Sequence, residues 1–455
     1  MNRPSVSFAL SRRLVLAGLA ASALPRPLHA DAHAAPAGGT RILSVADLHS
    51  AYGRLPELLT LMRAEAEAAD EVLVVVNGDL FELANPVATR SRGAADLAFL
   101  SALGELGPVI VNIGNHEPDF VADMAEVPDL LGGTGATVIS NILDPRTGRL
   151  YAPVTTRAPV AGTETIVAGI ATDNLFTYPE AIRTQVAIPK PVEYAEALIG
   201  RLSEAPMVLL SHAGVEADKA ILPLLPAGSV VVGGHDHIEL IHEEGGVYVH
   251  GGAWARVLSV LDVTAGAGGF EVAARQVDVP AEGEGDAELA ALIARLEDEH
   301  LTEADRAVLG TSPRAMDLRE TILFAAEAVR ERAGADLAVL GHTTFGAPLG
   351  AGPVRRYDFD AVVRFDGDIR VAEVDGATLR TILARANQHE AASLDARTGD
   401  YVHAAAIEVD DAATYRLATN GWTAMNQARY LGTEDLTFSP VEGLMLKAAV
   451  IDALG

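Results

Sequence analysis

Five short polar segments of the sequence combine aspartate, asparagine and histidine at spacings that suit metal binding. They read Asp47-Leu48-His49, Gly78-Asp79, Gly114-Asn115-His116-Glu117-Pro118-Asp119, Ser211-His212 and Gly233-Gly234-His235-Asp236-His237. Carboxylate and amide oxygens and imidazole nitrogens suit Mg²⁺, Mn²⁺, Fe²⁺, Co²⁺ or Zn²⁺. In Asp-x-His or His-x-His on an extended chain, the first and third side chains point to the same side, so both can reach one ion. The segments therefore predict a site for divalent metal ions.

Each polar segment directly follows a short apolar run, and these runs predict strands that end at one rim. The predicted strands are residues 41–46, 71–76, 109–113, 207–210 and 230–232. Predicted helices cover residues 55–69, 94–106 and 191–204, and this alternation is typical of an α/β layered domain. In such domains the carboxyl ends of the strands hold the active site. Taken alone, Ser211-His212 also fits a core histidine, and Asp119 also fits a helix N-cap.

The composition excludes several classes of protein. A length of 455 residues allows about two or three domains, each with a sizeable core. The chain has 34 Lys and Arg against 62 Asp and Glu, a formal net charge of −28, which is the wrong sign for binding nucleic-acid backbones. There is no Cys, so disulfides, thiolate metal sites and cysteine nucleophiles are excluded.

The first 30 residues have the pattern of a targeting segment. Arg12 and Arg13 precede a modest apolar stretch, residues 14–24, and small residues follow around Ala30 and Ala32. The apolar stretch is far shorter than the roughly 20 residues needed to span a bilayer. The pattern predicts a twin-arginine-type signal peptide over residues 1–30, hence passage through the twin-arginine export machinery to the periplasm and no stable membrane span. The alternative is an amphipathic or unstructured tail.

A polar, glycine-containing segment, residues 279–287, predicts a linker between two domains. The first domain would cover residues 41–278, and the second, a smaller α+β domain, residues 288–455. In the second part, predicted helices cover residues 288–298, 318–333, 377–388 and 441–454, and predicted strands cover residues 337–340, 369–374 and 415–418.

The five polar segments, taken in order, resemble the pattern of the calcineurin-like metallophosphoesterases. With the C-terminal α+β domain, the chain resembles in particular the exported bacterial 5′-nucleotidase and UDP-sugar hydrolase family. The resemblance implies a four-layer α-β-β-α sandwich followed by a 5′-nucleotidase-like domain that binds the substrate. It implies two divalent ions, whose ligands are Asp47, His49 and His237 for one, Asn115, His212 and His235 for the other, and Asp79 between them.

The resemblance also implies a reaction. The enzyme would be a periplasmic dimetal phosphohydrolase that cleaves phosphomonoesters, above all 5′-nucleotides, by attack of a metal-bridging hydroxide. His116, oriented by Asp119, would point to the substrate and protonate the leaving group.

The second domain departs from the family pattern where the family binds nucleosides. The family's Asn-x-Gly-Gly-x-Arg is replaced by residues 341–348, which contain no arginine, and Arg355 and Arg356 are candidates to replace it. These two arginines also fit a solvated edge. Residues 415–422 resemble the family's Tyr-x-x-Ala-Thr-Asn-x-aromatic strand.

Three aromatic residues, Phe345, Trp422 and Tyr430, are candidates to stack on a base, and each also fits core packing. The departures leave room for a second enzyme class on the same fold, a thiosulfohydrolase-like, sugar-phosphate or cyclic-nucleotide hydrolase. A third alternative is a non-enzymatic periplasmic protein that binds a metal or a ligand.

Overall fold

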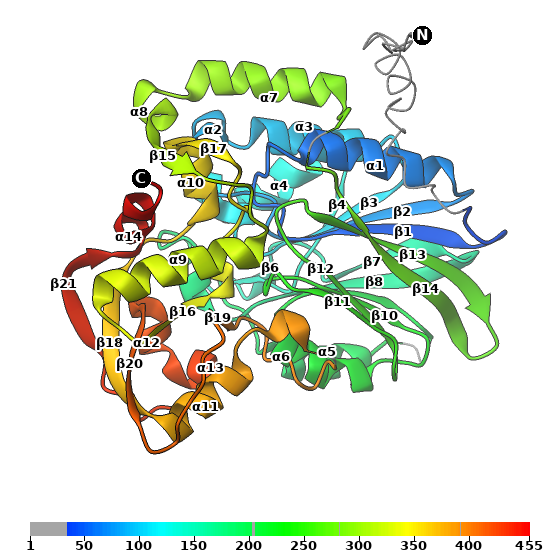
Figure 1. Cartoon of the computed structure of the whole chain (residues 1–455). Coiled ribbons are helices and arrows are strands. Elements are labelled where there is room, and N and C mark those ends of the chain that lie inside the picture. The colour runs from blue at the N-terminus through cyan, green and yellow to red at the C-terminus, as the bar shows by residue number, and fades with distance from the viewer. Residues whose placement is uncertain (1–33, 203–204, 282, 392) are drawn as a thin grey trace, which may run out of the picture. The chain divides into compact units, whose positions relative to one another are not determined.

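Two six-stranded sheets pack face to face in the first part of the chain (Figure 1). The order of the first is β14-β13-β1-β2-β3-β4 and that of the second is β11-β12-β10-β9-β8-β7. The first sheet contains β1 (Thr40–Val45), β2 (Val72–Asn77), β3 (Val109–Asn112), β4 (Thr137–Ile139), β13 (Val257–Gly266) and β14 (Gly269–Asp278). The second contains β7 (Thr155–Val160), β8 (Thr163–Ala171), β9 (Val208–His212), β10 (Val230–Gly233), β11 (Glu239–His242) and β12 (Val247–Gly251).

The computed structural model describes residues 34–202, 205–281, 283–391 and 393–455. Residues 34–455 form one unit, and the expected signal peptide lies outside the described residues. A search of these ranges finds no helix with the length and apolar character needed to cross a membrane.

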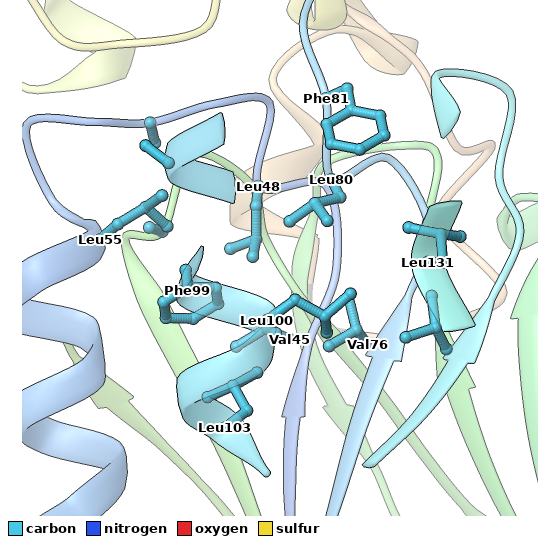
Figure 2. Close-up of a cluster of buried hydrophobic side chains, with 14 of the residues drawn as sticks. Val45, Leu48, Leu55, Val76, Leu80, Phe81, Phe99, Leu100, Leu103 and Leu131 are labelled. Carbon is cyan, nitrogen blue, oxygen red and sulfur yellow. The ribbon is translucent and has the colours of Figure 1, made fainter. Parts of the chain in front are cut away.

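Alternate side chains of the central strands serve different cores, as the period of a strand requires. In β1, Ile42 faces the second sheet, whereas Leu43 and Val45 face the helices that cover the first sheet. Figure 2 shows this outer core, in which Val45 and Val76 lie near Phe99 and Leu103. Its helices are α1 (Leu55–Glu67), α2 (Pro86–Ser91), α3 (Ala94–Leu103) and α4 (Glu126–Gly132).

Helices α5 (Pro191–Ile199) and α6 (Val215–Ile221) cover the outer face of the second sheet, which completes four layers, α-β-β-α. The predicted sandwich is confirmed. The five predicted strands correspond to β1, β2, β3, β9 and β10 within one or two residues, whereas β4, β11, β12 and the hairpins β7–β8 and β13–β14 have no counterpart among the predicted strands.

The second part of the chain has a five-stranded sheet of order β19-β16-β20-β18-β21. Its strands are β16 (Leu337–Gly341), β18 (Asp368–Asp375), β19 (Val402–Ala404), β20 (Thr414–Asn420) and β21 (Ser439–Met445). One face packs against α9 (Leu318–Ala333) and α14 (Leu446–Ala453), and the other packs against α11 (Gly376–Arg385) and α13 (Gln427–Leu431). Shorter elements are α8 (Glu303–Arg306), α10 (Arg356–Val362), α12 (Gly421–Met425), β15 (Val308–Ser312) and β17 (Gly352–Arg355).

Helix α9 begins and ends where the sequence predicts. Asp317 and Glu320 form a capping box at its start, and Gly334 closes it in the left-handed region, with φ 60°. The predicted helix over residues 441–454 is wrong in its first part, because residues 439–445 form β21. This segment pairs with the edge of β18, so a long-range contact overrides its local preference.

Helix α7 (Ala287–His300) follows the predicted linker and packs on the first domain rather than the second. Its apolar side chains Leu289, Ile293 and Leu296 belong to the same core as α1 and α3. Figure 1 shows α7 running along α2 and α3. The domain boundaries proposed from sequence stay a prediction.

Candidate metal centre

All five polar segments lie at the carboxyl ends of strands from both sheets. They follow β1, β2 and β3 of the first sheet and β9 and β10 of the second. The parallel registers bring these ends level, with Asn77 of β2 opposite Asn112 of β3 and Ser211 of β9 opposite Gly233 of β10. The structure therefore gathers at one rim every residue that the sequence singled out as a ligand.

Two buried amides hold the two sheets together beneath this rim. Asn77 donates through Nδ2 to the carbonyls of Ser211 and Val232, each at 2.9 Å. Asn112 donates to Asn77 Oδ1 at 2.9 Å and to Ile170 O at 2.9 Å. Because buried amides cost free energy unless they are hydrogen-bonded, this network fixes the spacing between the sheets. The sequence analysis missed it, although two asparagines inside apolar strands were a visible signal.

One group of possible ligands consists of Asp47, His49 and His237, with one ligand atom from each within 4.8 Å of the others. His49 Nε2 lies 3.0 Å from His237 Nε2, and His237 Nε2 lies 3.6 Å from Asp47 Oδ1. All three side chains are buried. Three donor atoms thus lie close together in a buried part of the rim.

A second group consists of Asp79, His212 and His235, again within 4.8 Å of one another. His235 Nδ1 also lies 3.0 Å from Asn115 Oδ1, which adds an amide oxygen. Asp79 Oδ2 lies 3.3 Å from His212 Nε2 and 3.8 Å from His49 Nε2. The carboxylate of Asp79 therefore stands between the two groups.

The backbone of the site is held in an unusual conformation. Asp47, His49, Asp79, His235 and His237 all have positive φ, between 48° and 82°. Non-glycine residues rarely occupy this left-handed region, and clusters of them are typical of functional sites. A Cβ added to Gly114 would lie 2.5 Å from Asp79 Oδ1, so only glycine fits there.

The donor set fits divalent cations. Within the described part of the chain, His212 Nε2 is buried and has no hydrogen-bond partner. His212 Nδ1 lies 2.7 Å from Asn77 O, so in the neutral imidazole Nδ1–H donates to that carbonyl and the lone pair of Nε2 faces Asp79. This arrangement, in which the second ring nitrogen is held by an outer acceptor, is typical of metal-binding histidines.

Charge within the site sets the protonation states. Burial lowers the pKa of His49, His235 and His237 well below the ordinary value, so these rings keep a lone pair for a cation. Burial alone would raise the pKa of Asp79, but neighbouring imidazoles, His212 above all, hold it well below its ordinary value. Burial would lower the pKa of His212, yet Asp79 raises it to about 10. A bound cation would replace that proton.

His116 sits beside the two groups and is held by Asp119. His116 Nδ1 lies 2.9 Å from Asp119 Oδ2, which also accepts from the backbone N–H of Leu83 at 2.8 Å. Burial alone would lower the pKa of His116, whereas the charges of Asp119 and Asp79 raise it to about 10. His116 can therefore carry a proton at neutral pH.

Glu117 supports the same loop, and the sequence analysis gave it no role. It is fully buried, and its carboxylate accepts from the backbone N–H groups of Asp79, Leu80 and Gly114 at 3.1, 2.8 and 2.6 Å. The loops after β2 and β3 are tied together by this one side chain.

The second domain also reaches the rim through side chains that the sequence analysis did not identify. Arg364 pairs with Glu82 at 2.7 Å, and its Nη2 lies 3.1 Å from His49 Nδ1. His342 Nε2 lies 3.2 Å from the carbonyl of His237. Arg429 lies 3.5 Å from Asp236. None of these contacts has a local signal, because the partners are far apart in the sequence.

The aromatic substrate candidates differ in exposure. Trp422 is 41% exposed, and its Nε1–H donates to the hydroxyl of Tyr430 at 3.0 Å. Tyr430 is buried and bonds through its hydroxyl to Asp400. Phe345 is buried in the core formed with α9, which gives its ring a packing role.

The two arginine candidates differ in their surroundings. Arg355 pairs with Asp358 at 2.7 Å and lines a cavity of about 990 Å³ between the domains. Arg356 begins α10 and is exposed.

Comparison with known proteins gives the following matches. Residues 40–239 match the family model of the calcineurin-like phosphoesterases, and residues 302–433 match that of the 5′-nucleotidase C-terminal domain. A search of curated proteins finds no match.

Several solved structures are similar over nearly the whole chain. A 5′-nucleotidase precursor from Thermus thermophilus is 18% identical, covers 91% of this chain and 96% of its own, and has a TM-score of 0.59. The sulfate thiohydrolase SoxB from Thermus thermophilus is 16% identical, with 92% and 94% coverage and a TM-score of 0.62. A 5′-nucleotidase from Candida albicans is 10% identical, with 93% and 99% coverage and a TM-score of 0.58. At these identities the structures show a common fold.

Proposed function

Since this chain belongs to the calcineurin-like 5′-nucleotidase family and is a metal-dependent phosphoester hydrolase, we propose that it cleaves phosphomonoesters with two divalent ions and that 5′-nucleotides are its main substrates. The observation that carries this proposal is the position of Asp79. Its Oδ2 lies within 3.3 Å of His212 Nε2 and 3.8 Å of His49 Nε2, one from each ligand group. A single carboxylate can therefore serve both ions.

Seven side chains would hold the ions. They are Asp47, His49 and His237 in one group, Asn115, His212 and His235 in the other, and Asp79 between them. Bound divalent cations supply charge neutralisation at the phosphate oxygens and activation of a water molecule for attack on phosphorus. Their identity is open among Mn²⁺, Zn²⁺, Mg²⁺, Co²⁺ and Fe²⁺, since oxygen and imidazole donors suit all of them.

His116 supplies the proton that the leaving group needs. Its Nδ1–H donates to Asp119, which leaves Nε2–H as the atom that can protonate the departing alkoxide. Asp119 is itself fixed by the backbone N–H of Leu83, so the imidazole keeps one orientation. General acid catalysis of this kind contributes about 10²–10⁴-fold.

Recognition of the nucleoside is assigned to the second domain, with Trp422 as the stacking side chain. Its ring is partly exposed, while its N–H is held by Tyr430, so one face is available at low entropic cost. Trp422→Ala should raise the KM for nucleoside monophosphates by the equivalent of about 1–3 kcal/mol. The KM for a simple sugar phosphate should stay unchanged, and equal effects on both substrates would contradict a stacking role.

A panel of hydrolysis assays tests the function as a whole. The full chain, stripped with a chelator and then supplied with Mn²⁺ or another ion, should hydrolyse nucleotides faster than sugar phosphates, cyclic nucleotides or thiosulfate conjugates. Phosphate release follows the phosphomonoesters, chromatography of the nucleotide product follows the cyclic nucleotides, and sulfate release follows the thiosulfate conjugates. Preference for thiosulfate conjugates would favour the thiosulfohydrolase alternative. Metal binding without turnover of any substrate would favour the non-enzymatic alternative.

We further propose export to the periplasm by the twin-arginine machinery, with residues 1–30 as signal. The support is the sequence alone, namely Arg12 and Arg13 before a short apolar stretch. Replacing both arginines by lysine should leave an active, metal-loaded precursor in the cytoplasmic fraction. Normal export of this variant would show that the segment is an ordinary secretory signal.

A further inference from the structure

One arginine of the second domain is buried against the metal centre of the first. Arg364 follows α10, and its side chain is only 2% exposed. Its Nη2 lies 2.7 Å and its Nε 2.9 Å from the same oxygen, Oε2 of Glu82, whose side chain is 3% exposed. Buried charges persist only when they are paired and hydrogen-bonded, so this pair is a built feature of the interface between the domains.

The pair lies directly against His49. The two nitrogens of this ring face opposite ways. Nε2 faces the ligand group, 3.0 Å from His237 Nε2 and 3.8 Å from Asp79 Oδ2. Nδ1 faces the second domain, 3.1 Å from Arg364 Nη2 and 3.5 Å from Glu82 Oε2. Nδ1, the ring nitrogen that faces away from the ligand group, is therefore in contact with both members of this pair.

Aromatic packing holds the same ring from another direction. Trp254 stacks on His49 with ring centroids 5.7 Å apart and an interplanar angle of 26°. The guanidinium carbon of Arg364 lies 5.7 Å from the ring of Trp254. Arg364 thus touches both the carboxylate and the indole that orient His49.

The chemistry of the imidazole explains why this matters. The lone pair of Nε2 is free for a cation only when the ring proton is on Nδ1. Arg364 Nη2, 3.1 Å from Nδ1, can only donate, so the acceptor within reach of an Nδ1–H is Glu82 Oε2, 3.5 Å from Nδ1. Glu82 Oε1 accepts from the backbone N–H of Ala84 at 3.0 Å. Arg364 holds Oε2 with two donors of its planar fork, which a lysine cannot reproduce.

We propose that Arg364 is a positioning residue through which the second domain prepares His49 for metal binding, so that docking of the second domain and loading of the ion held by Asp47, His49 and His237 favour each other. The inference rests on the proposed metal centre and goes beyond it, because a residue of the substrate domain now governs one of the two ions. By linkage, the coupling works in both directions.

The test is a metal competition experiment on the full chain. Arg364→Met should weaken binding of one ion by about 10–100-fold, measured against a chromophoric chelator, while the second ion is held as in the wild type. Metal content after dialysis should fall from two equivalents to one. At saturating metal the KM for a phosphomonoester should stay unchanged, because Arg364 acts through His49.

Three further variants extend the test, and the first two keep it decisive if Arg364→Met folds poorly. Glu82→Gln removes the charge with little change of shape and should weaken the same ion. Arg364→Lys should weaken binding of this ion less than Arg364→Met does. The losses in a Glu82→Gln, Arg364→Met double variant should be smaller than additive, since both act on His49.

The matched control is Lys219→Ala. Lys219 Nζ donates to the carbonyl of Arg397 at 2.7 Å, a contact between the domains that touches no ligand residue. An equal loss of metal in this control would overturn the inference, because any weakening of docking would then suffice. Unchanged metal binding in Arg364→Met, or a raised KM with unchanged metal binding, would overturn it as well. A wild-type chain that binds no metal would instead overturn the proposed function.

Discussion

Two clusters of histidine rings lie on either side of the interface between the domains, and they differ in their neighbours. The first-domain cluster consists of His49, His116, His212, His235 and His237, with Asp47, Asp79 and Asp119 among them. The second-domain cluster consists of His342, His389 and His403 stacked with Tyr401. Within the described ranges, every group with the spacing of a metal site comes from the first domain.

The difference shows that proximity of imidazoles does not by itself make a metal site. In the first cluster, Asp79 raises the pKa of His212 to about 10 against the effect of burial. In the second, burial lowers the pKa of His342 to about 4 and that of His403 to about 2. In the first cluster, His212 and His116 hold protons beside Asp79 and Asp119, and a cation can replace the proton of His212. The other three rings of that cluster, His49, His235 and His237, are neutral and offer lone pairs. The buried rings of the second cluster are neutral as well and stack as flat aromatic groups.

Removal of Asp79, the carboxylate shared by the two ligand groups, should have the largest effect on metal binding and on activity. Asp79→Ala should release both ions and lower kcat by more than about 10³-fold, more than the loss of one stabilising donor usually costs. Metal analysis and phosphate release measure the two effects. Asp96→Asn is the matched control, because Asp96 is equally buried but bonds to Tyr52 at 2.7 Å and not to a ligand. Two ions retained in Asp79→Ala would contradict the shared role.

A substitution of His116 should separate the catalytic step from metal binding in the first cluster. His116→Asn should keep both ions and lower kcat by about 10²–10⁴-fold, with a smaller loss for nitrophenyl esters, whose leaving group needs no proton. His403→Gln, a change in the second cluster, should leave kcat unchanged. An equal loss for good and poor leaving groups would exclude the general-acid role of His116.

Much of the first domain could be predicted from sequence, because its signals are local. Strands such as residues 109–113 are apolar runs, and the ligands stand directly after them, so strand ends and ligands are found together. Parallel topology brings the residues after β1, β2 and β3 to one edge of the first sheet and those after β9 and β10 to one edge of the second. That Asp47 and His237 meet depends in addition on how the two sheets pack.

The rest depends on contacts that no local pattern encodes. Arg364 and Glu82 are 282 residues apart, and neither stands in a motif. Residues 439–445 became β21 because the edge of β18 was available, although their composition is compatible with a helix. The exposure of Trp422 and the burial of Phe345 likewise depend on which side of a sheet each segment reaches.

The smallest expected effect concerns the pH dependence of stability in the second cluster. His403 Nε2 lies 3.0 Å from His342 Nδ1, and His342 Nε2 lies 3.2 Å from the carbonyl of His237. Neutral rings satisfy this chain when His403 Nε2–H donates to His342 and His342 Nε2–H donates to the carbonyl. Burial lowers the pKa of His403 from its ordinary value near 6.5 to about 2, so the unfolded chain takes up this proton first. Stability from this neutral ring is therefore present above about pH 6.5 and is lost as the pH falls below it.

Between pH 7.5 and pH 5.5 the contribution of His403 to this loss is about 1.4 kcal/mol. His403→Gln keeps a donor for His342 but cannot titrate, so its free energy of unfolding should fall less over the same range, by about that amount. Urea unfolding at both pH values measures the difference.

His116→Gln should change the pH dependence of the free energy of unfolding with the opposite sign. The raised pKa of His116, about 10, gives stability that is present below pH 6.5 and lost as the pH rises toward 10, because Asp119 and Asp79 hold its proton in the folded state. The distinction between His403 as a neutral stacked ring and His116 as a charged ring would fail if both substitutions changed the pH dependence of the free energy of unfolding in the same direction.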